Sequence, residues 1–126
     1  MESPYKGKTG LARLVQATRN SIDGFKLAYQ HESAFRQEVW MAAVLLPVAA
    51  LAPVDTLERL MLVGSVLVLL IVELLNSSVE AAIDRIGLER HELSKRAKDL
   101  GSAAVFVALV LLALTWGTIF FVRFVR

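Results

Sequence analysis

Cysteine is absent from this sequence of 126 residues, and histidine occurs only twice. The lack of cysteine excludes a disulfide scaffold, a thiolate metal site and a cysteine nucleophile, and two histidines are too few for a histidine-rich metal site. The net charge is only +2, so charge alone does not indicate a nucleic-acid partner, and we expect none. Neither G-x-x-x-x-G-K-[S/T] nor G-x-G-x-x-G occurs, so a nucleotide site would differ from that of a P-loop protein or a protein kinase.

Apolar residues, in contrast, are abundant: they make up 56% of the chain, and the mean hydropathy is +0.55. Soluble domains have roughly 45–50% apolar residues, and a chain this small buries only a modest fraction of its surface. The apolar residues concentrate in three segments, 34–54, 59–83 and 100–122, near the length of about 20 residues that crosses a bilayer. The composition therefore predicts an all-α membrane protein with three transmembrane helices in one domain, residues 1–126.

Basic residues predict the orientation of these spans. Six lie before the uncharged run 39–54 of the first span and five lie in the segment 84–99 between the second and third spans, whereas the opposite side has one near Asp55 and two after the third span. The six are Lys6, Lys8, Arg13, Arg19, Lys26 and Arg36, and the five are Arg85, Arg90, Lys95, Arg96 and Lys98. On the opposite side, Arg59 lies near Asp55, and Arg123 and Arg126 follow the third span. Because cytoplasmic loops collect Lys and Arg, we expect the N-terminus and the segment 84–99 in the cytoplasm and the C-terminus on the opposite side.

The N-terminal segment 10–31 has a different pattern. Its larger apolar residues fall on one face of a helix, and polar residues occupy the other faces. The apolar face contains Leu11, Leu14, Val15, Ile22, Phe25 and Tyr29. Next to three spans, this pattern indicates an amphipathic helix on the inner membrane surface; the alternative is a soluble helix that packs on a partner protein.

The second span carries a stripe of polar residues that suggests chemistry. At 100° per residue, these residues fall within an arc of about 100° on one helix face; they are Glu73, Asn76, Ser77, Glu80 and Asp84. Placing a carboxylate at membrane depth costs roughly several kcal/mol of free energy, so such a residue indicates a function. Glu73 suits the role of a general base. The alternative is that these groups hydrogen-bond neighbouring helices and hold an oligomer together.

Two further polar clusters flank this stripe on the same side of the membrane. Residues 32–38 (ESAFRQE) join the surface helix to the first span, and residues 91–102 (HELSKRAKDLGS) supply cations where the third span begins. Carboxylates suit a hard divalent ion such as Mg²⁺, and lysine and arginine suit phosphate. Together they predict a phosphoryl-transfer site at the inner interface, although basic residues there also follow from topology alone.

At these residues the sequence resembles the small prokaryotic diacylglycerol kinases. The pattern E-x-x-N-S-x-[I/V]-E-x-x-[I/V]-D matches residues 73–84, E-x-A-F-R-Q-E matches residues 32–38, and R-A-K-D-x-G-S-A-A-V matches residues 96–105. The resemblance extends over roughly residues 10–117 without obvious gaps. Ala82 stands where a bulkier residue is usual, and Asn20 where some members have an aromatic residue.

The resemblance implies a homotrimer of three-span subunits in the bacterial inner membrane, with active sites shared between subunits. The implied reaction moves the ATP γ-phosphoryl group to the primary hydroxyl of diacylglycerol and gives phosphatidic acid. By position, Glu73 is the general base, and Glu32 and Glu80 bind Mg²⁺. The implied ATP contacts are Arg13, Asn20, Glu32, Glu80, Glu89, Arg90, His91, Lys98 and Asp99; the implied lipid contacts are Glu73, Asn76, Ala34, Phe35, Arg36, Gln37, Glu38, Ser102 and Trp116.

Three alternatives remain at this stage. An undecaprenol kinase would have the same fold, although the run Phe35–Glu38 looks more like the diacylglycerol-type members of Gram-negative bacteria. A small proton-coupled transporter would also carry a membrane carboxylate, but it usually has four spans and no cytoplasmic cluster of acids and lysines. A non-catalytic assembly subunit would use the polar stripe only for packing.

Overall fold

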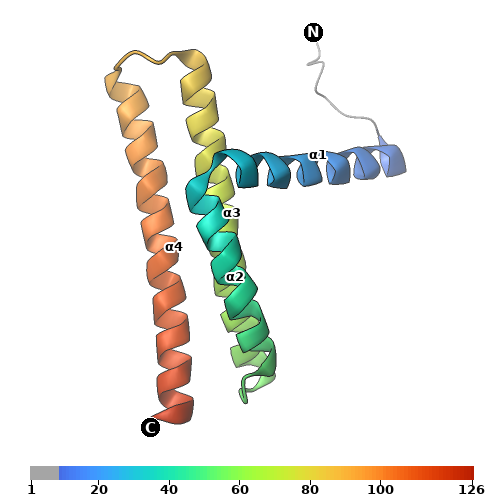
Figure 1. Cartoon of the computed structure of the whole chain (residues 1–126), viewed down its shortest axis with the longest axis vertical. Helices are drawn as coiled ribbons and strands as arrows, with labels where there is room; N and C mark the ends of the chain where they lie inside the picture. Colours follow the sequence, from blue (N-terminus) through green and yellow to red (C-terminus); the bar gives the residue numbers. More distant parts are fainter. Residues whose placement is uncertain (1–8) are drawn as a thin grey trace.

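The computed structural model describes residues 9–126 and contains four α-helices joined by short connections (Figure 1): α1 Gly10–His31, α2 Ser33–Leu51, α3 Thr56–Ile86 and α4 Glu92–Phe124. Three of them, α2, α3 and α4, are long and apolar enough to cross a membrane. The described part of the chain contains no strand. The prediction of an all-α protein with three membrane-length helices is therefore confirmed, while Lys6 and Lys8 lie outside the described residues.

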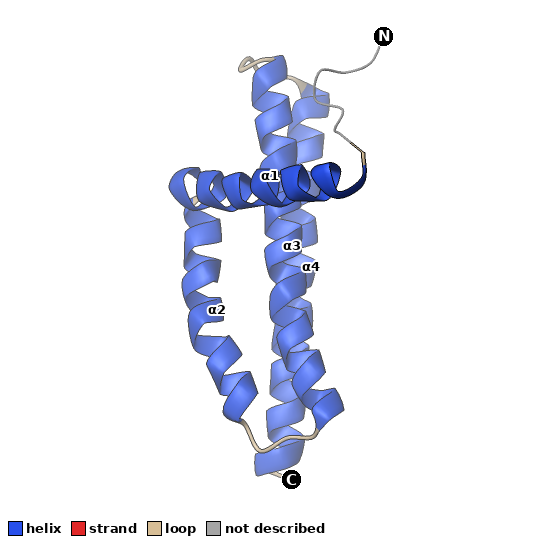
Figure 2. Cartoon of the chain, turned by 90° about the vertical axis from the view of Figure 1, so that its right-hand side faces the viewer, coloured by secondary structure: helices blue, strands red, loops and turns tan. Residues whose placement is uncertain are grey.

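Helix α3 is the central element. Both α2 and α4 pack along it, and α4 runs antiparallel to α3. Helix α1 lies crosswise to the other three and contacts α2, as both views show (Figures 1 and 2). Figure 1 also shows that α3 and α4 continue past α1 toward the connection between them. The residues of the polar stripe therefore lie close to the level at which α1 meets the bundle.

The helices α3 and α4 extend further than the apolar segments. Only residues 87–91 connect them, so most of the basic segment 84–99 is helical. At the start of α4, the His91 side chain accepts a hydrogen bond from the Leu93 backbone N–H at 3.1 Å. At the start of α3, Asp55 and Glu58 form a capping box, in which each side chain accepts from the other's backbone N–H.

The core follows one face of α3. Leu62, Val66 and Leu69 are fully buried, and they pack against small residues of α2 and apolar residues of α4. The partners on α2 are Ala42 and Ala49, and those on α4 are Ala108, Leu112 and Ile119. Most other large apolar side chains of α4 are exposed in the single chain; Phe106, for example, is 67% exposed. Such a surface suits contact with lipid or with further copies of the chain.

Charged residues join the helices at the end of the molecule far from residues 87–91. Arg59 donates hydrogen bonds to the carbonyl oxygens of Ala49, Ala50 and Val54 at 2.5, 2.8 and 3.1 Å. Arg123, near the C-terminal end of α4, forms ion pairs with Asp55 and Glu58 of α3. These contacts satisfy the last carbonyl groups of α2 and fix the ends of α3 and α4 relative to each other.

Candidate active site

The polar stripe lies on α3, as its helical spacing predicts. Glu73 is buried, with 4% of its surface exposed, while Asn76, Ser77 and Glu80 are half-buried and Asp84 is exposed. The stripe thus runs from the interior of the bundle to its exposed end near residues 87–91. A helix places these residues on one face because they follow each other at intervals of three, four and seven.

Acidic side chains from three parts of the chain lie near Glu73. The buried Glu38 of α2 is one of them, and the charges of Glu32 and Glu80 also act on Glu73. Carboxylates that lie this close repel each other unless a proton or a cation reduces their charge. The cluster is therefore a place where a cation or a transferred proton would be stabilised.

Several oxygen atoms in this cluster are buried and accept or donate no hydrogen bond within the described chain. They are Oε2 of Glu38, Oδ1 of Asn76 and Oγ of Ser77. Buried polar groups without partners cost free energy, roughly 1–3 kcal/mol each, and in a functional site they commonly await a ligand. In the described residues no three His, Asp or Glu side chains come together in metal-binding geometry. A Mg²⁺ ion, however, is often held by one or two carboxylates together with substrate phosphates, and the carboxylates of Glu32 and Glu80, whose charges act on Glu73, suit such an ion.

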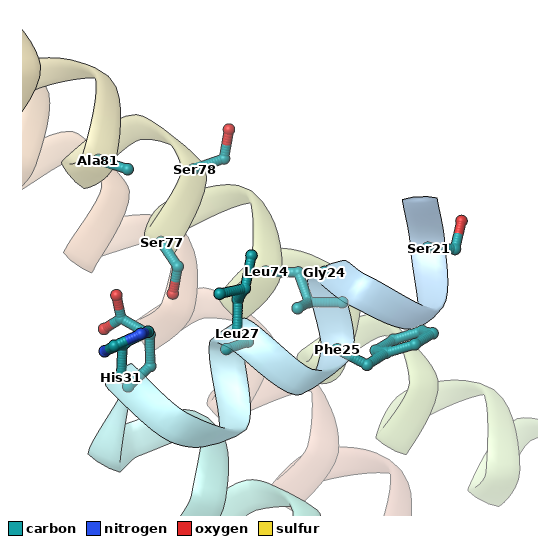
Figure 3. Close-up of a pocket in the computed structure, with 11 residues that line it drawn as sticks. Ser21, Gly24, Phe25, Leu27, His31, Leu74, Ser77, Ser78 and Ala81 are labelled. Carbon is teal, nitrogen blue, oxygen red and sulfur yellow. The ribbon is translucent and has the colours of Figure 1, made fainter. Parts of the chain in front are cut away.

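A cavity of about 620 Å³ lies between α1 and α3, next to the acidic cluster (Figure 3). Its lining residues are Ser21, Gly24, Phe25, Leu27, Ala28, His31, Glu32, Leu74, Ser77, Ser78 and Ala81. Figure 3 shows Ser77 and His31 at one end of the cavity and the Phe25 ring at the other, with Leu27 and Leu74 between them. The cavity is therefore mostly apolar, with His31 and Ser77 at one end and the Ser21 hydroxyl near the Phe25 ring at the other, a combination that suits an amphiphilic molecule.

A second cavity, of about 660 Å³, lies where α3 and α4 are connected. It is lined by Ile83, Asp84, Gly87, Leu88, Glu89, Arg90, His91, Glu92, Ser94, Lys95, Lys98 and Asp99. Lys98 Nζ pairs with Asp84 Oδ1 at 3.0 Å, and Lys95 Nζ pairs with Asp99 Oδ2 at 2.6 Å. The structure thus brings together five of the predicted nucleotide contacts: Glu89, Arg90, His91, Lys98 and Asp99.

Other predicted site residues lie elsewhere in the single chain. Arg13 and Asn20 belong to α1 and line neither cavity; Asn20 accepts a hydrogen bond from Gln16. Trp116 donates to Ser65 Oγ at 3.1 Å, and Ser65 is about 12 Å along α3 from Glu73. The lipid contact of Trp116 and the nucleotide contacts of Arg13 and Asn20 therefore stay predictions.

The run 34–38 divides between the interior and the surface. Phe35 and Glu38 are buried, Ala34 and Gln37 are exposed, and Ser102 is exposed on α4. Arg36 Nη1 donates hydrogen bonds to the carbonyl oxygens of Tyr29 and Gln30, at 2.8 and 3.0 Å. Arg36 therefore caps the C-terminal end of α1, a role that the sequence motif alone did not indicate.

The contact of Arg36 with α1 leads to a testable expectation. In the variant Arg36→Ala the last carbonyl groups of α1 lose a charged donor, and the final turn of α1 should open more often. We expect amide hydrogen exchange at residues 28–32 to become faster by on the order of tenfold, which corresponds to about 1.4 kcal/mol. The exposed neighbour variant Gln37→Ala is the control, and equal exchange in the two variants would contradict the capping role.

Fold and site together define an integral membrane protein in which a buried cluster of carboxylates lies beside a polar cavity lined by charged side chains of both signs. The family model described as prokaryotic diacylglycerol kinase matches residues 19–120. The chain is 55% identical over 117 residues to the diacylglycerol kinase of Pseudomonas aeruginosa, covering 93% of this chain and 95% of the relative. It is 47% identical over 113 residues to that of Haemophilus influenzae (90% and 96% covered) and 45% identical over 108 residues to that of Escherichia coli K12 (86% and 88% covered).

This chain therefore belongs to the prokaryotic diacylglycerol kinase family and is an enzyme of that class. The match covers α2 and α3 in full, α4 as far as residue 120, and every predicted site residue except Arg13. The resemblance inferred from the motifs of residues 32–38, 73–84 and 96–105 is confirmed.

Proposed function

We propose that this protein transfers the γ-phosphoryl group of ATP directly to the primary hydroxyl of diacylglycerol, which gives phosphatidic acid and ADP. The observation that carries this proposal is the position of Glu73. It is buried among other carboxylates, on the helix that lines both the mostly apolar cavity beneath α1 and the polar cavity at residues 87–91. The first cavity is lined by residues 74–81 of α3, which follow Glu73 directly, and the second by Ile83 and Asp84, one turn further along. Glu73 itself lines neither cavity, so a lipid alcohol and a nucleotide would approach neighbouring turns of α3 next to it.

Glu73 acts as the general base in this proposal. Its carboxylate takes the proton of the lipid hydroxyl, the hydroxyl oxygen forms a bond to the γ-phosphorus, and the bond from that phosphorus to the β–γ bridging oxygen breaks. The electron pair of the broken bond leaves with ADP. No covalent intermediate on the protein is required, because in-line transfer depends chiefly on positioning and on charge neutralisation.

Glu32 and Glu80 would hold Mg²⁺ together with the ATP phosphates. The bound ion would neutralise negative charge on the phosphates during transfer. Lys98, which pairs with Asp84, would contact the phosphates from α4 once that ion pair opens. Glu89, Arg90, His91 and Asp99 line the same cavity. Asn76 would lie beside the reacting groups, since it follows Glu73 by three residues on the same helix face.

Helix α1 would lie on the cytoplasmic surface of the membrane. Its apolar residues Leu11, Leu14, Ile22 and Phe25 are exposed in the single chain, which suits burial in the interfacial region of a bilayer. Diacylglycerol places its hydroxyl at this depth, and the cavity between α1 and α3 could take up part of its apolar body. We place the N-terminus and residues 87–91 in the cytoplasm of a bacterial inner-membrane protein, and the C-terminus in the periplasm.

A homotrimer with shared active sites agrees with two features of the chain. Much of the apolar surface of α4 is uncovered in the single chain. Arg13 and Asn20 line neither cavity of their own chain, so they could reach a nucleotide only in another arrangement of α1 or on a neighbouring subunit. An active site shared between subunits would account for both features.

The test is ATP-dependent phosphorylation of diacylglycerol by the purified protein in detergent micelles, with labelled ATP and with or without Mg²⁺. We expect labelled phosphatidic acid only when Mg²⁺ is present. Undecaprenol is supplied as a second acceptor in a parallel assay, and preferential labelling of it would assign the chain to the other lipid substrate. Proton-driven uptake by vesicles without consumption of ATP would overturn the kinase proposal.

A further inference from the structure

Helices α3 and α4 form a series of close contacts along their interface. In one of these contacts a side chain of α3 lies against a glycine of α4. Near the connection, Lys98 pairs with Asp84; deeper in the bundle, Val105 and Ala108 pack with the core around Leu69. Gly101 lies between these two levels on α4. Opposite Gly101 lies Asn76, a member of the polar stripe.

The carboxamide of Asn76 occupies the space where a side chain at Gly101 would lie. A Cβ atom built on Gly101 collides with Asn76 Oδ1 and comes within 3.1 Å of Asn76 Cγ. The oxygen and the NH₂ group of Asn76 are both bonded to Cγ. A flip that exchanges the two groups would therefore still leave one of them in contact with the added Cβ atom. By contrast, nothing lies within 4 Å of a Cβ built on Gly64 or Gly117, which belong to the same two helices. A side chain at position 101 would therefore have to displace the Asn76 amide, a conflict that positions 64 and 117 do not have.

Packing rather than hydrogen bonding holds the Asn76 amide in place. Its Oδ1 atom is buried and has no hydrogen-bond partner within the described chain. Because the oxygen faces Gly101 on α4, the NH₂ group at the other end of the amide is left for other partners. Asn76 shares its helix face with Glu73 and Glu80, so this donor lies at the level of the acidic cluster.

We propose that Gly101 is a positioning residue of the active site: it holds the Asn76 carboxamide beside Glu73 so that the amide NH₂ can donate to an oxygen of the phosphate or the lipid. The inference rests on the proposed kinase function. Even one methyl group at position 101 would displace the amide by an ångström or more, roughly, and a misplacement of this size in an active site can lower a rate by up to about 10².

The first test observes the Asn76 side chain without any activity measurement. The chain contains only two asparagines, Asn20 and Asn76, so selective ¹⁵N-asparagine labelling gives two side-chain NH₂ signal pairs in micelles. The variant Asn76→Ala identifies its own pair by loss. We expect Gly101→Ala to move the Asn76 pair by more than its linewidth and to leave the Asn20 pair in place, while Gly117→Ala moves neither.

The second test measures kinetics in a double-mutant cycle. Gly101→Ala should lower kcat by on the order of tenfold or more, with little change in the KM for ATP, and Gly117→Ala should stay within about twofold of the unmodified protein. If Gly101 acts through Asn76, then adding Gly101→Ala to Asn76→Ala should lower kcat no further. Should Gly101→Ala alone fail to fold, recovery of folded protein in the double variant supports the proposal, because the shortened residue 76 leaves room for the methyl group.

Some outcomes would overturn this proposal. An unchanged Asn76 signal in folded Gly101→Ala, multiplicative losses of kcat in the double variant, or a double variant that also fails to fold would each show that Gly101 does not act through Asn76. An inactive unmodified protein would instead reject the kinase function, and the NMR comparison would still decide whether Gly101 holds the Asn76 amide.

Discussion

Replacing Glu73 by glutamine should lower kcat by on the order of 10² or more and leave the assembly intact. Glutamine keeps the size of the side chain and its place in the core but cannot accept the proton of the lipid hydroxyl, so only base catalysis is lost. The measurement is the initial rate of phosphatidic acid formation at saturating ATP and diacylglycerol. The oligomeric state, from size-exclusion chromatography, reports whether the fold is kept.

A matched control is Asp23→Asn, which makes the same chemical change at an exposed position of α1. We expect its rate to stay within about twofold of that of the unmodified protein, since exposed substitutions away from the site have small effects. A rate for Glu73→Gln close to that of the control would remove Glu73 from the role of base. In that case the neighbouring Glu38, which is buried against it, would be the next carboxyl group to replace.

Replacing Glu80 by glutamine should change the dependence on metal more than the dependence on lipid. Loss of one of two carboxylate ligands weakens the hold on Mg²⁺, and we expect the Mg²⁺ concentration for half-maximal rate to rise on the order of tenfold. The measurement is a titration of free Mg²⁺ at saturating ATP. Glu32→Gln should shift the curve in the same direction, because Glu32 is the other proposed carboxylate ligand of the ion.

An unchanged Mg²⁺ titration together with a reduced kcat would contradict the ligand role of Glu80. Such a result would leave Glu80 as a group that acts on Glu73 only through its charge. Asp23→Asn again serves as the control, since it removes a carboxylate that lies outside both cavities.

The fold could be predicted from the sequence because its main determinant is local. Long uncharged segments specify membrane-length helices whatever their neighbours are. The ends of the helices were harder to predict, since α4 starts at Glu92 and not near residue 100. Lysine, arginine, glutamate and alanine between residues 92 and 99 are good helix formers, and the His91 cap starts the helix, so a charged segment that marks the cytoplasmic side is also helical.

The candidate site was predictable only where one helix determines it. The spacing from Glu73 to Asp84 fixes a common face of α3 without any tertiary information. The roles of Arg36 and Gly101 depend on contacts between helices: Arg36 binds carbonyl groups of α1, and Gly101 faces Asn76 of α3. No periodicity in the sequence encodes which glycine of α4 meets a polar side chain, and Gly117 in the same helix meets none.

The uncharged part of α3 runs from Arg59, which binds the backbone at the end of α2, to Glu73. These residues are about 21 Å apart along the helix axis, whereas the hydrocarbon core of a bilayer is about 30 Å thick. With Arg59 at one boundary, Glu73 lies beneath the other unless the bilayer thins around the protein. In the proposed reaction, the thickness of the surrounding lipid would therefore determine how deep the hydroxyl must lie, and the acyl chains of the host membrane would act on turnover without being substrates themselves.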